Sequence, residues 1–295
     1  MSNFSQNNET DVLEQVIIGR HDTYCSEPAY IERVNTAQKE RLPSYHRIEK
    51  EIDTFHKTLE LEGIEVLLPD PVGKFVYDQL TPRDIGVTIG QKFLLCNMTH
   101  KSRRYECAGI FKHIDKKSDI EPEILIPDAP HVFIEGGDII VDKKKIFVGL
   151  TERTNQAGFE YLQKAFKNEF EVIPIEVKSK EEGEDILHLD CMFNPVGKNH
   201  ALIYEEGFKN IPVAIHNSYN LIPITQQEQR ELVLNVLSLS QTKVINRKHA
   251  KAERVNSLLR DRGIEVIELP FEAVVSTGGS FRCSSLPLRR KQPKQ

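Results

Sequence analysis

The feature of this chain that most limits its fold is internal repetition. The segment LEGIEVLLP (61–69) is similar to DRGIEVIELP (261–270), and KNEFEVIPI (167–175) is a weaker third copy. Helical spacing precedes each of the first two copies. Self-similarity at the level of a helix and a strand indicates a repeated architecture.

A second repeat is a hairpin that opens with an acid. PRDIGVTIGQKFLL, EGGDIIVDKKKIFV and HLDCMFNPVGKNHALI each place an aspartate (Asp84, Asp138 or Asp190) before an apolar stretch, a turn and a return strand. The predicted unit is therefore hairpin, helix, strand. Several such units around an axis would bring the hairpin starts together, and with them Asp84, Glu135, His188 and Asp190.

The remaining pattern fits this mixed unit. Strands or hairpins are predicted at 14–20, 86–96, 133–150 and 187–207. Helices are predicted around 44–62, 102–114, 153–168, 225–237 and 249–262. We find no linker rich in Gly, Ser or Pro, so one domain is predicted at 14–290. It lies between a flexible polar lead (1–13) and a solvated tail (291–295).

Charge and composition exclude several classes of protein. The 39 Lys and Arg against 44 Asp and Glu give a net charge of -5, without a long block of one sign, which makes nucleic acid an improbable partner. No apolar run approaches the ~18 residues of a membrane-spanning helix. The polar start, MSNFSQNNETD, is unlike a signal peptide and favours the cytoplasm. Five scattered cysteines, an odd number, are typical of free thiols in a reducing compartment.

Two segments carry candidate acid, base and nucleophile groups. In His188-Leu-Asp190 the two polar side chains share a face if the segment is a strand, because residues i and i+2 of a strand point the same way. In TGGSFRC the thiol of Cys283 follows glycines that permit close approach of the backbone to a substrate. A lone cysteine is most often a small buried hydrophobe. With a histidine and carboxylates elsewhere in the chain, Cys283 is instead a candidate nucleophile. Further His or Cys at ligand spacing is lacking, so we expect no catalytic metal.

Four motifs in order resemble one superfamily. They are TPRD ending at Asp84, EGGD beginning at Glu135, LHLDCMFNP with His188 and Asp190, and GGSFRC ending at Cys283. The set is similar to the penteins, the guanidino-modifying superfamily of arginine deiminases, dimethylarginine dimethylaminohydrolases and amidinotransferases. The resemblance implies a five-bladed α/β propeller of ββαβ modules without metal or cofactor.

The resemblance also implies roles. Cys283 attacks the guanidinium carbon, His188 acts as acid and then base, and Glu135 orients His188 and contacts substrate. Asp84 and Asp190 bind the guanidinium nitrogens, in agreement with the paired charge-assisted hydrogen bonds that carboxylates make with this planar cation.

An arginine-like substrate also needs cations for its carboxylate. Arg153, in GLTERTN, resembles the family's carboxylate-binding arginine, and Arg103 or Arg104, in HKSRRYE, is the second candidate. Asp78 matches a substrate-contacting acid of the dimethylarginine hydrolases. The residue before the nucleophile is Arg282, where many relatives carry His, and its role is open.

The branch of the superfamily is less well determined. Glu135 resembles the hydrolases, whereas PRDI and MTHKSRRYE resemble the amidinotransferases. Because Glu135 is expected next to the reacting centre, we weight it more heavily and predict a hydrolase of arginine or an N-methylated arginine. An amidinotransferase is the first alternative, and a non-catalytic guanidino-binding propeller is the second. The predicted partner is a small guanidino compound; the sequence leaves open whether the chain forms a homo-oligomer.

Overall fold

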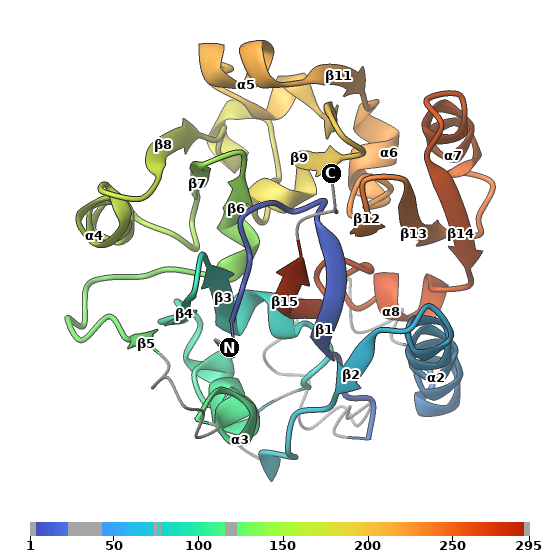
Figure 1. Ribbon diagram of the computed structural model, residues 1–295, viewed down its shortest axis with the longest axis horizontal. Helices are drawn as coiled ribbons and strands as arrows, with labels where there is room; N and C mark the ends of the chain where they lie inside the picture. The colour runs from blue at the N-terminus through green and yellow to red at the C-terminus, as the bar shows by residue number, and fades with distance from the viewer. Residues whose placement is uncertain (1–3, 23–42, 74–75, 77, 116–122, 292–295) are drawn as a thin grey trace.

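The hairpin repeat of the sequence recurs around the whole molecule. The computed structural model describes residues 4–22, 43–73, 76, 78–115 and 123–291, and these residues form five three-stranded sheets around a central axis (Figure 1). The sheets are β15–β1–β2, β3–β4–β5, β6–β7–β8, β9–β10–β11 and β12–β13–β14. The prediction of a five-bladed α/β propeller is confirmed.

The first half of the strands comprises β1 (Val12–Ile18), β2 (Glu65–Leu67), β3 (Gly86–Ile89), β4 (Lys92–Leu95), β5 (Glu123–Leu125), β6 (Ile139–Asp142), β7 (Lys145–Leu150) and β8 (Glu171–Glu176). The others are β9 (Phe193–Val196), β10 (His200–Ile203), β11 (Asn220–Pro223), β12 (Leu237–Ser240), β13 (Lys243–Arg247), β14 (Glu265–Leu269) and β15 (Ser285–Lys291). The α-helices are α2 (Tyr45–Leu61), α3 (Phe111–Ile114), α4 (Gln156–Phe166), α5 (Val213–Ser218), α6 (Gln226–Arg230), α7 (Glu253–Arg260) and α8 (Glu272–Val275).

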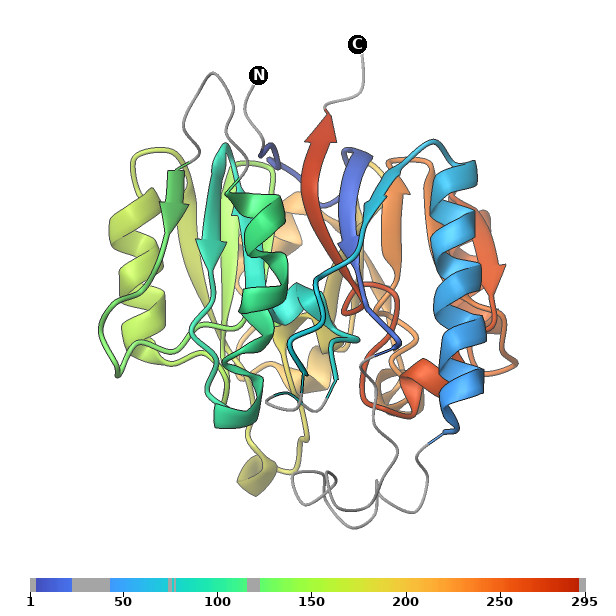
Figure 2. The same ribbon diagram turned by 90° about the horizontal axis from the view of Figure 1, so that it is seen from below.

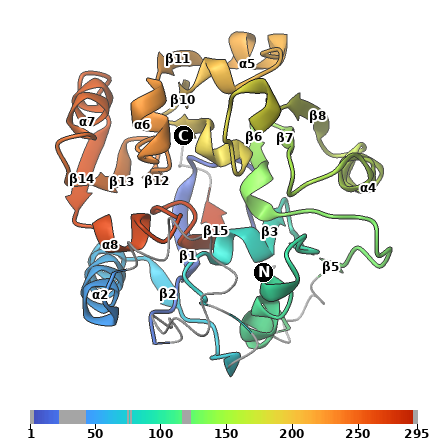
Figure 3. The same ribbon diagram turned by 180° about the vertical axis from the view of Figure 1, so that it is seen from behind.

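The blade around β6 illustrates the ββαβ unit. Strands β6 and β7 pair antiparallel across a turn at Lys143 and Lys144, whose φ angles of 50° and 64° suit the twist of a tight hairpin. Helix α4 then leads to β8, which pairs parallel with β7. All four residues of β6 are buried, whereas β8 is partly exposed. The apolar core thus lies toward the axis, and α2, α4 and α7 lie outside (Figure 3).

Both ends of the chain build one blade. Strand β1 pairs antiparallel with β15 and parallel with β2, so the last strand lies beside the first. Figure 2 shows the first and last described residues on the same side of the molecule. This closure removes the two open edges that a linear array of blades would leave.

The N-terminal segment differs from the prediction. Residues 1–13 were expected to be a flexible lead, but Phe4 is fully buried, Gln6 and Glu9 are buried, and β1 begins at Val12. The backbone of Ser5 bonds to that of Leu288 in β15, and Gln6 bonds to Gly90 in the turn of the β3–β4 hairpin. Apolar burial and long-range pairing outweigh the polar composition. Strand β15 reaches Lys291, and the rest of the predicted tail lies outside the described residues.

Two predicted helices are shorter than their sequence pattern. Of 102–114 only α3 is α-helical, after two 3₁₀ helices, and of 225–237 only α6 is. Leu232 ends the second pattern because its φ of 53° is left-handed. The longest described helix, α2, buries the apolar side chains of Ile48, Ile52 and Phe55 and is otherwise mostly polar. In the described part of the chain, no helix combines the length and apolar character needed to cross a membrane.

Candidate active site

The hairpin starts converge as 3₁₀ turns rather than as strands. Pro82–Ile85, Gly136–Asp138 and Leu189–Cys191 each precede the first strand of a blade. The two glycines of EGGD lie against neighbouring turns. A Cβ on Gly136 would lie 2.1 Å from the carbonyl oxygen of Arg83, and one on Gly137 would lie 2.7 Å from the His188 ring. The glycines therefore allow the three turns to meet at the axis.

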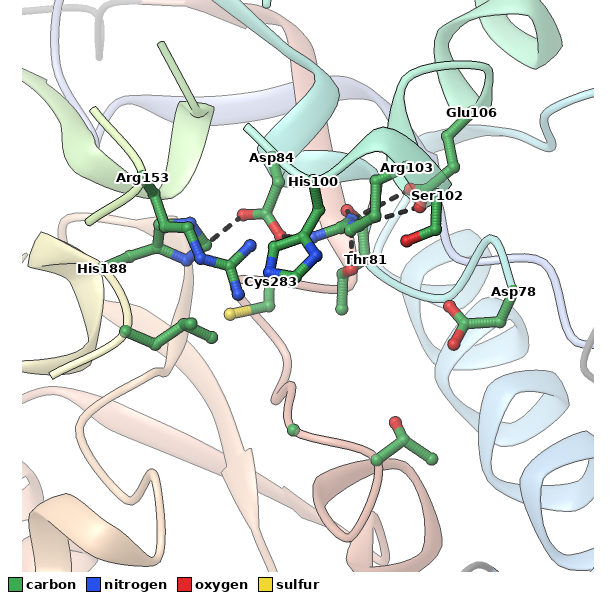
Figure 4. A pocket seen from close by; sticks show the side chains of 13 residues that line it. Asp78, Thr81, Asp84, His100, Ser102, Arg103, Glu106, Arg153, His188 and Cys283 are labelled. Atoms are coloured by element: carbon green, nitrogen blue, oxygen red, sulfur yellow. Dashed lines mark hydrogen bonds and ion pairs between the residues drawn. The ribbon is translucent and has the colours of Figure 1, made fainter. Parts of the chain in front are cut away.

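A cavity of about 220 Å³ opens at this meeting point. Of the nine predicted site residues, six line it: Asp78, Asp84, Arg103, Arg153, His188 and Cys283 (Figure 4). Sequence reasoning missed Thr81, His100, Ser102, Glu106, Leu187, Thr277 and Gly278, which complete the lining. Several of these missed residues belong to the quoted segments HKSRRYE and TGGSFRC, but nothing local distinguished them from surface residues.

His188 lies between two carboxylates. Its Nε2 is 2.9 Å from Glu135 Oε2, and its Nδ1 is 3.7 Å from Asp84 Oδ1. Burial by itself would lower the pKa of His188, but Asp84 and Glu135 outweigh it and raise the pKa well above its ordinary value. Burial by itself would raise the pKa of Glu135, but the hydrogen bond and the charge of His188 lower it. The pair is thus an imidazolium and a carboxylate at neutral pH, which gives the pocket a proton donor.

Cys283 meets Asp190 behind the pocket wall. Its Sγ is 3.9 Å from Asp190 Oδ2, and the same oxygen accepts a 2.6 Å hydrogen bond from Arg282 Nη1. Asp190 is fully buried and is not among the residues that line the cavity. The prediction that Asp190 shares a strand face with His188 is wrong, because His188 is extended and Asp190 lies in a 3₁₀ turn.

Cys191 is a second thiol at this carboxylate. Its Sγ is 3.5 Å from Asp190 Oδ1. A hydrogen bond with the Cys283 thiol, together with burial, raises the pKa of Cys191, so this thiol stays protonated. The four described cysteines are free, and only Cys283 among them lines the cavity. Cys25 lies outside the described residues.

Asp84 lines the cavity, and only one of its two carboxylate oxygens accepts a hydrogen bond from the described residues. Its Oδ2 accepts a 2.7 Å hydrogen bond from Arg103 Nη1, while its buried Oδ1 accepts no hydrogen bond from the described residues. Arg103 is also held by Glu106 in a bidentate pair, with N–O distances of 2.8 and 2.9 Å, and by Thr81 Oγ1 at 2.8 Å. The neighbour of Asp84 Oδ1, His188 Nδ1, is 3.7 Å away, beyond hydrogen-bond length, so this oxygen can still accept N–H groups of a ligand.

The arginines predicted to bind the substrate carboxylate differ in how many of their N–H donors are already engaged. Arg153 borders the cavity, and its Nη1 is 3.5 Å from Glu135 Oε2, a long contact that leaves most of its donors available. Arg104 is not part of the cavity lining, since it donates to the carbonyl oxygen of Met98 and lies over the ring of Phe133. Of the pair Arg103/Arg104, only Arg103 enters the site. Among the described residues, no three His, Cys, Asp or Glu side chains are arranged to hold a metal ion.

Known proteins provide an independent comparison. Residues 27–290 match the family model described as N,N dimethylarginine dimethylhydrolase, eukaryotic. The chain is 32% identical over 235 residues to the uncharacterized protein YkgA of Bacillus subtilis, covering 79% of this chain and 77% of that protein. It is 24% identical to the L-arginine:L-lysine amidinotransferase of Pseudomonas savastanoi pv. phaseolicola, covering 96% of this chain and 93% of that one.

The fold is shared with solved structures. An amidinotransferase of saxitoxin biosynthesis from Microseira wollei superposes with a TM-score of 0.81 at 22% identity, covering 99% of both chains. At this identity the likeness concerns the fold alone. The family model spans most of the chain and includes all four motifs. The chain therefore belongs to the N,N dimethylarginine dimethylhydrolase family of the pentein superfamily, whose members modify guanidino groups.

Proposed function

We propose that the chain is a cysteine-dependent hydrolase that acts on the guanidino group of arginine or an N-methylated arginine. One observation carries the proposal: Cys283, the protonated His188 and Asp84 line the same cavity. These are the nucleophile, acid and cation-binding groups that attack on a guanidinium requires.

Substrate binding follows from charge. Asp84 Oδ1 accepts N–H groups of the guanidinium, and the bound cation lies beside the Cys283 sulfur. Positive charge next to a thiol favours the thiolate. Asp190 is proposed to act on the sulfur side of the site, since Arg282 already holds the oxygen nearest the thiol.

In the first step the Cys283 thiolate attacks the guanidinium carbon and forms a C–S bond. The tetrahedral centre then collapses, and the C–N bond to the terminal nitrogen breaks. His188 donates its proton to the departing amine, which leaves as ammonia or a methylamine. The product of this step is a thiouronium covalently bound to Cys283.

In the second step water attacks the thiouronium carbon while the now neutral His188 takes a proton from it. The C–S bond breaks, the thiolate is restored, the remaining hydroxyl proton passes to solvent, and the ureido product leaves. Glu135 holds His188 through Nε2 in both steps. An acid-base residue of this kind typically contributes ~10²- to 10⁴-fold to the rate.

Arg153 is the proposed partner of the substrate carboxylate, because Arg103 is already engaged by Asp84, Glu106 and Thr81. Arginine or methylarginine should consequently be turned over better than agmatine, which lacks the carboxylate. The charge-assisted hydrogen bonds of a guanidinium with a carboxylate are roughly twice as strong as neutral ones. A preference for agmatine would refute this role of Arg153.

An amidinotransferase remains the second candidate, supported by a curated amidinotransferase that aligns over 96% of the chain. The two reactions share the thiouronium and differ in what attacks it. In favour of water we weigh Glu135, where transferases generally have Asp. The longer carboxylate changes the space left for an acceptor amine.

Product analysis by mass spectrometry separates the candidates. Arginine, Nω-methylarginine and agmatine are each incubated with the enzyme, with and without glycine or lysine, and Cys283→Ser provides the blank. A ureido product formed at the same rate without acceptor supports the hydrolase. An amidino group transferred to the added amine supports the transferase. Binding without turnover in wild-type protein would leave the non-catalytic alternative.

A further inference from the structure

The N-terminal segment places one carboxylate inside the propeller. Glu9 is buried, and its backbone N–H donates to Asp142 at the end of β6. Asn8 accepts from the backbone of Lys143 in the β6–β7 turn, so the segment covers the end of the blades where the hairpins turn. The cavity lies at the other end, where the hairpins start. Glu9 therefore points into the axis from the side opposite the pocket.

Inside the axis, Glu9 meets the residue that precedes the nucleophile. Its Oε1 accepts a 3.1 Å hydrogen bond from Arg282 Nη2, and the other arm of the same guanidinium, Nη1, bonds to Asp190 Oδ2 at 2.6 Å. That oxygen is the one 3.9 Å from the Cys283 sulfur. An unbroken chain of polar contacts thus runs from Glu9 through Arg282 and Asp190 to the thiol.

Around this series of contacts, positive charges outnumber the carboxylate at Glu9. Three buried guanidinium groups face Glu9: Arg282, Arg83 and Arg290. The acids and weak acids near Glu9 or the thiol are Asp190, Asp142, Tyr219 and Cys191. Burial by itself would raise the pKa of Glu9, but the three guanidinium groups lower it, so Glu9 is ionised. Burial by itself would lower the pKa of Arg282, but Glu9 and Asp190 raise it.

We propose that Glu9 is a positioning residue for the nucleophile. By holding one arm of Arg282, it sets how strongly that guanidinium neutralises Asp190 and stabilises a negative charge on the Cys283 sulfur. The inference rests on the proposed role of Cys283. The inference adds that a residue of the N-terminal segment influences the acidity of this thiol. Glu9 lies 273 positions before Arg282 in the sequence.

The direction in which the acidity of the Cys283 thiol changes distinguishes an electrostatic role of Glu9 from a purely structural one. If Glu9 is replaced by Gln, Arg282 loses one of its two counter-charges and acts more fully on Asp190 and the thiolate. The thiolate then forms at lower pH although the protein is less stable. A purely structural Glu9 would lower stability and leave the thiol unchanged, or make it less acidic as water enters.

The test measures the thiol directly. Iodoacetamide alkylation of the Cys283 peptide is followed by mass spectrometry between pH 5 and pH 10 in wild type, Glu9→Gln, Glu9→Asp and Asp11→Asn. Asp11 is the matched control, because it is a buried acid of the same segment that contacts Asn8 rather than Arg282. The readout needs no turnover, so a failed proposal for the reaction would not obscure it.

We expect Glu9→Gln to move the midpoint of the rate profile down by roughly 0.5 to 1 pH unit, the scale of one lost charge inside a protein. Asp11→Asn should leave it within about 0.2 unit of wild type, by the same reasoning for a more distant charge. An unchanged or higher midpoint in folded Glu9→Gln overturns the proposal. If that variant does not fold, Glu9→Asp decides: its shorter carboxylate retreats from Arg282, so a smaller downward shift supports the proposal and none refutes it.

Discussion

At the residue scale, the site depends on buried charges that act through one another. His188 is flanked by Asp84 and Glu135, and the Cys283 sulfur lies 3.9 Å from Asp190. Each of these side chains is almost fully buried, where an unpaired charge would be costly. Removing one member therefore changes the protonation of its neighbours as well as its own contact.

Cys283→Ser should abolish turnover while the protein still folds and binds guanidino ligands. A serine hydroxyl lacks thiolate character and is a poor nucleophile without an activating base. Turnover and ligand binding are measured on the same sample, by product analysis and by calorimetry. Cys107→Ser serves as control, since Cys107 is a half-exposed thiol outside the cavity. Substantial activity in Cys283→Ser would exclude the proposed covalent mechanism.

Glu135→Gln should move the alkaline limb of the pH–rate profile to lower pH. The first step requires protonated His188, and activity is lost as pH rises through the pKa of that residue. Glu135 is one of the groups that raise this pKa, so its neutralisation lowers the pKa and the limb moves down. Titration of the imidazole by NMR gives the same quantity without turnover. Asp185→Asn, at an exposed acid paired with Lys180, should move nothing. A limb that stays in place in Glu135→Gln would argue against the imidazolium as the acid.

At the element scale, the blade of β6, β7 and β8 relies on the loop that joins its hairpin to α4. Asn155 caps α4: its side chain accepts from the N–H of Gly158 at 2.9 Å and from that of Phe133 at 3.2 Å. Its amide also donates to the carbonyl of His131 at 2.8 Å. One residue thus fixes the helix start and the strand-like segment before Glu135, and it lies two positions after Arg153.

Asn155→Ala should lower the free energy of unfolding by about 1 to 2 kcal/mol, the usual cost of losing a helix cap. Urea denaturation followed by circular dichroism measures it. Ser44→Ala is the matched control, because Ser44 precedes α2 without a capping hydrogen bond from its side chain. Equal losses in the two variants would mean that the Asn155 contacts contribute nothing to stability.

At the scale of the whole molecule, the propeller is closed by its two ends. Strand β15 lies between β1 and the neighbouring blade, and the segment before β1 covers the axis with Phe4 and Glu9. The ring of Phe4 packs on that of Phe93, with centroids 5.2 Å apart. Phe4 and Glu9 therefore belong to the core rather than to a lead.

Phe4→Ala should destabilise the whole protein by about 3 to 5 kcal/mol, the range for truncating a buried phenylalanine. Because the first and last strands close the propeller, the loss of stability should appear in the global unfolding transition. Differential scanning calorimetry measures it, with Phe111→Ala as control because Phe111 is 47% exposed. A melting temperature equal to that of wild type would instead support the prediction of a flexible N-terminal lead.

The sequence by itself determined the repeating unit and its arrangement around an axis, and six of the nine residues that it proposed for the site line the cavity. Alternating apolar residues and turn chemistry are local signals, and they locate the hairpins that open at Asp84, Asp138 and Asp190. Because the motifs recur at the starts of hairpins, their meeting at one axis follows from the repeat. The resemblance added the roles proposed for Cys283 and His188, which periodicity could not supply.

The tertiary structure alone decided which charged groups become partners. Asp190 turns toward Arg282 and not toward the cavity, Arg103 enters the site while Arg104 does not, and Glu9 reaches the axis. The reason is that a buried charge is stabilised by whichever opposite charge the fold brings within hydrogen-bond reach, and Glu9 lies 273 positions from Arg282. Local pattern indicates which face of a helix or strand is apolar, but it carries no information on partners that only closure of the propeller brings together.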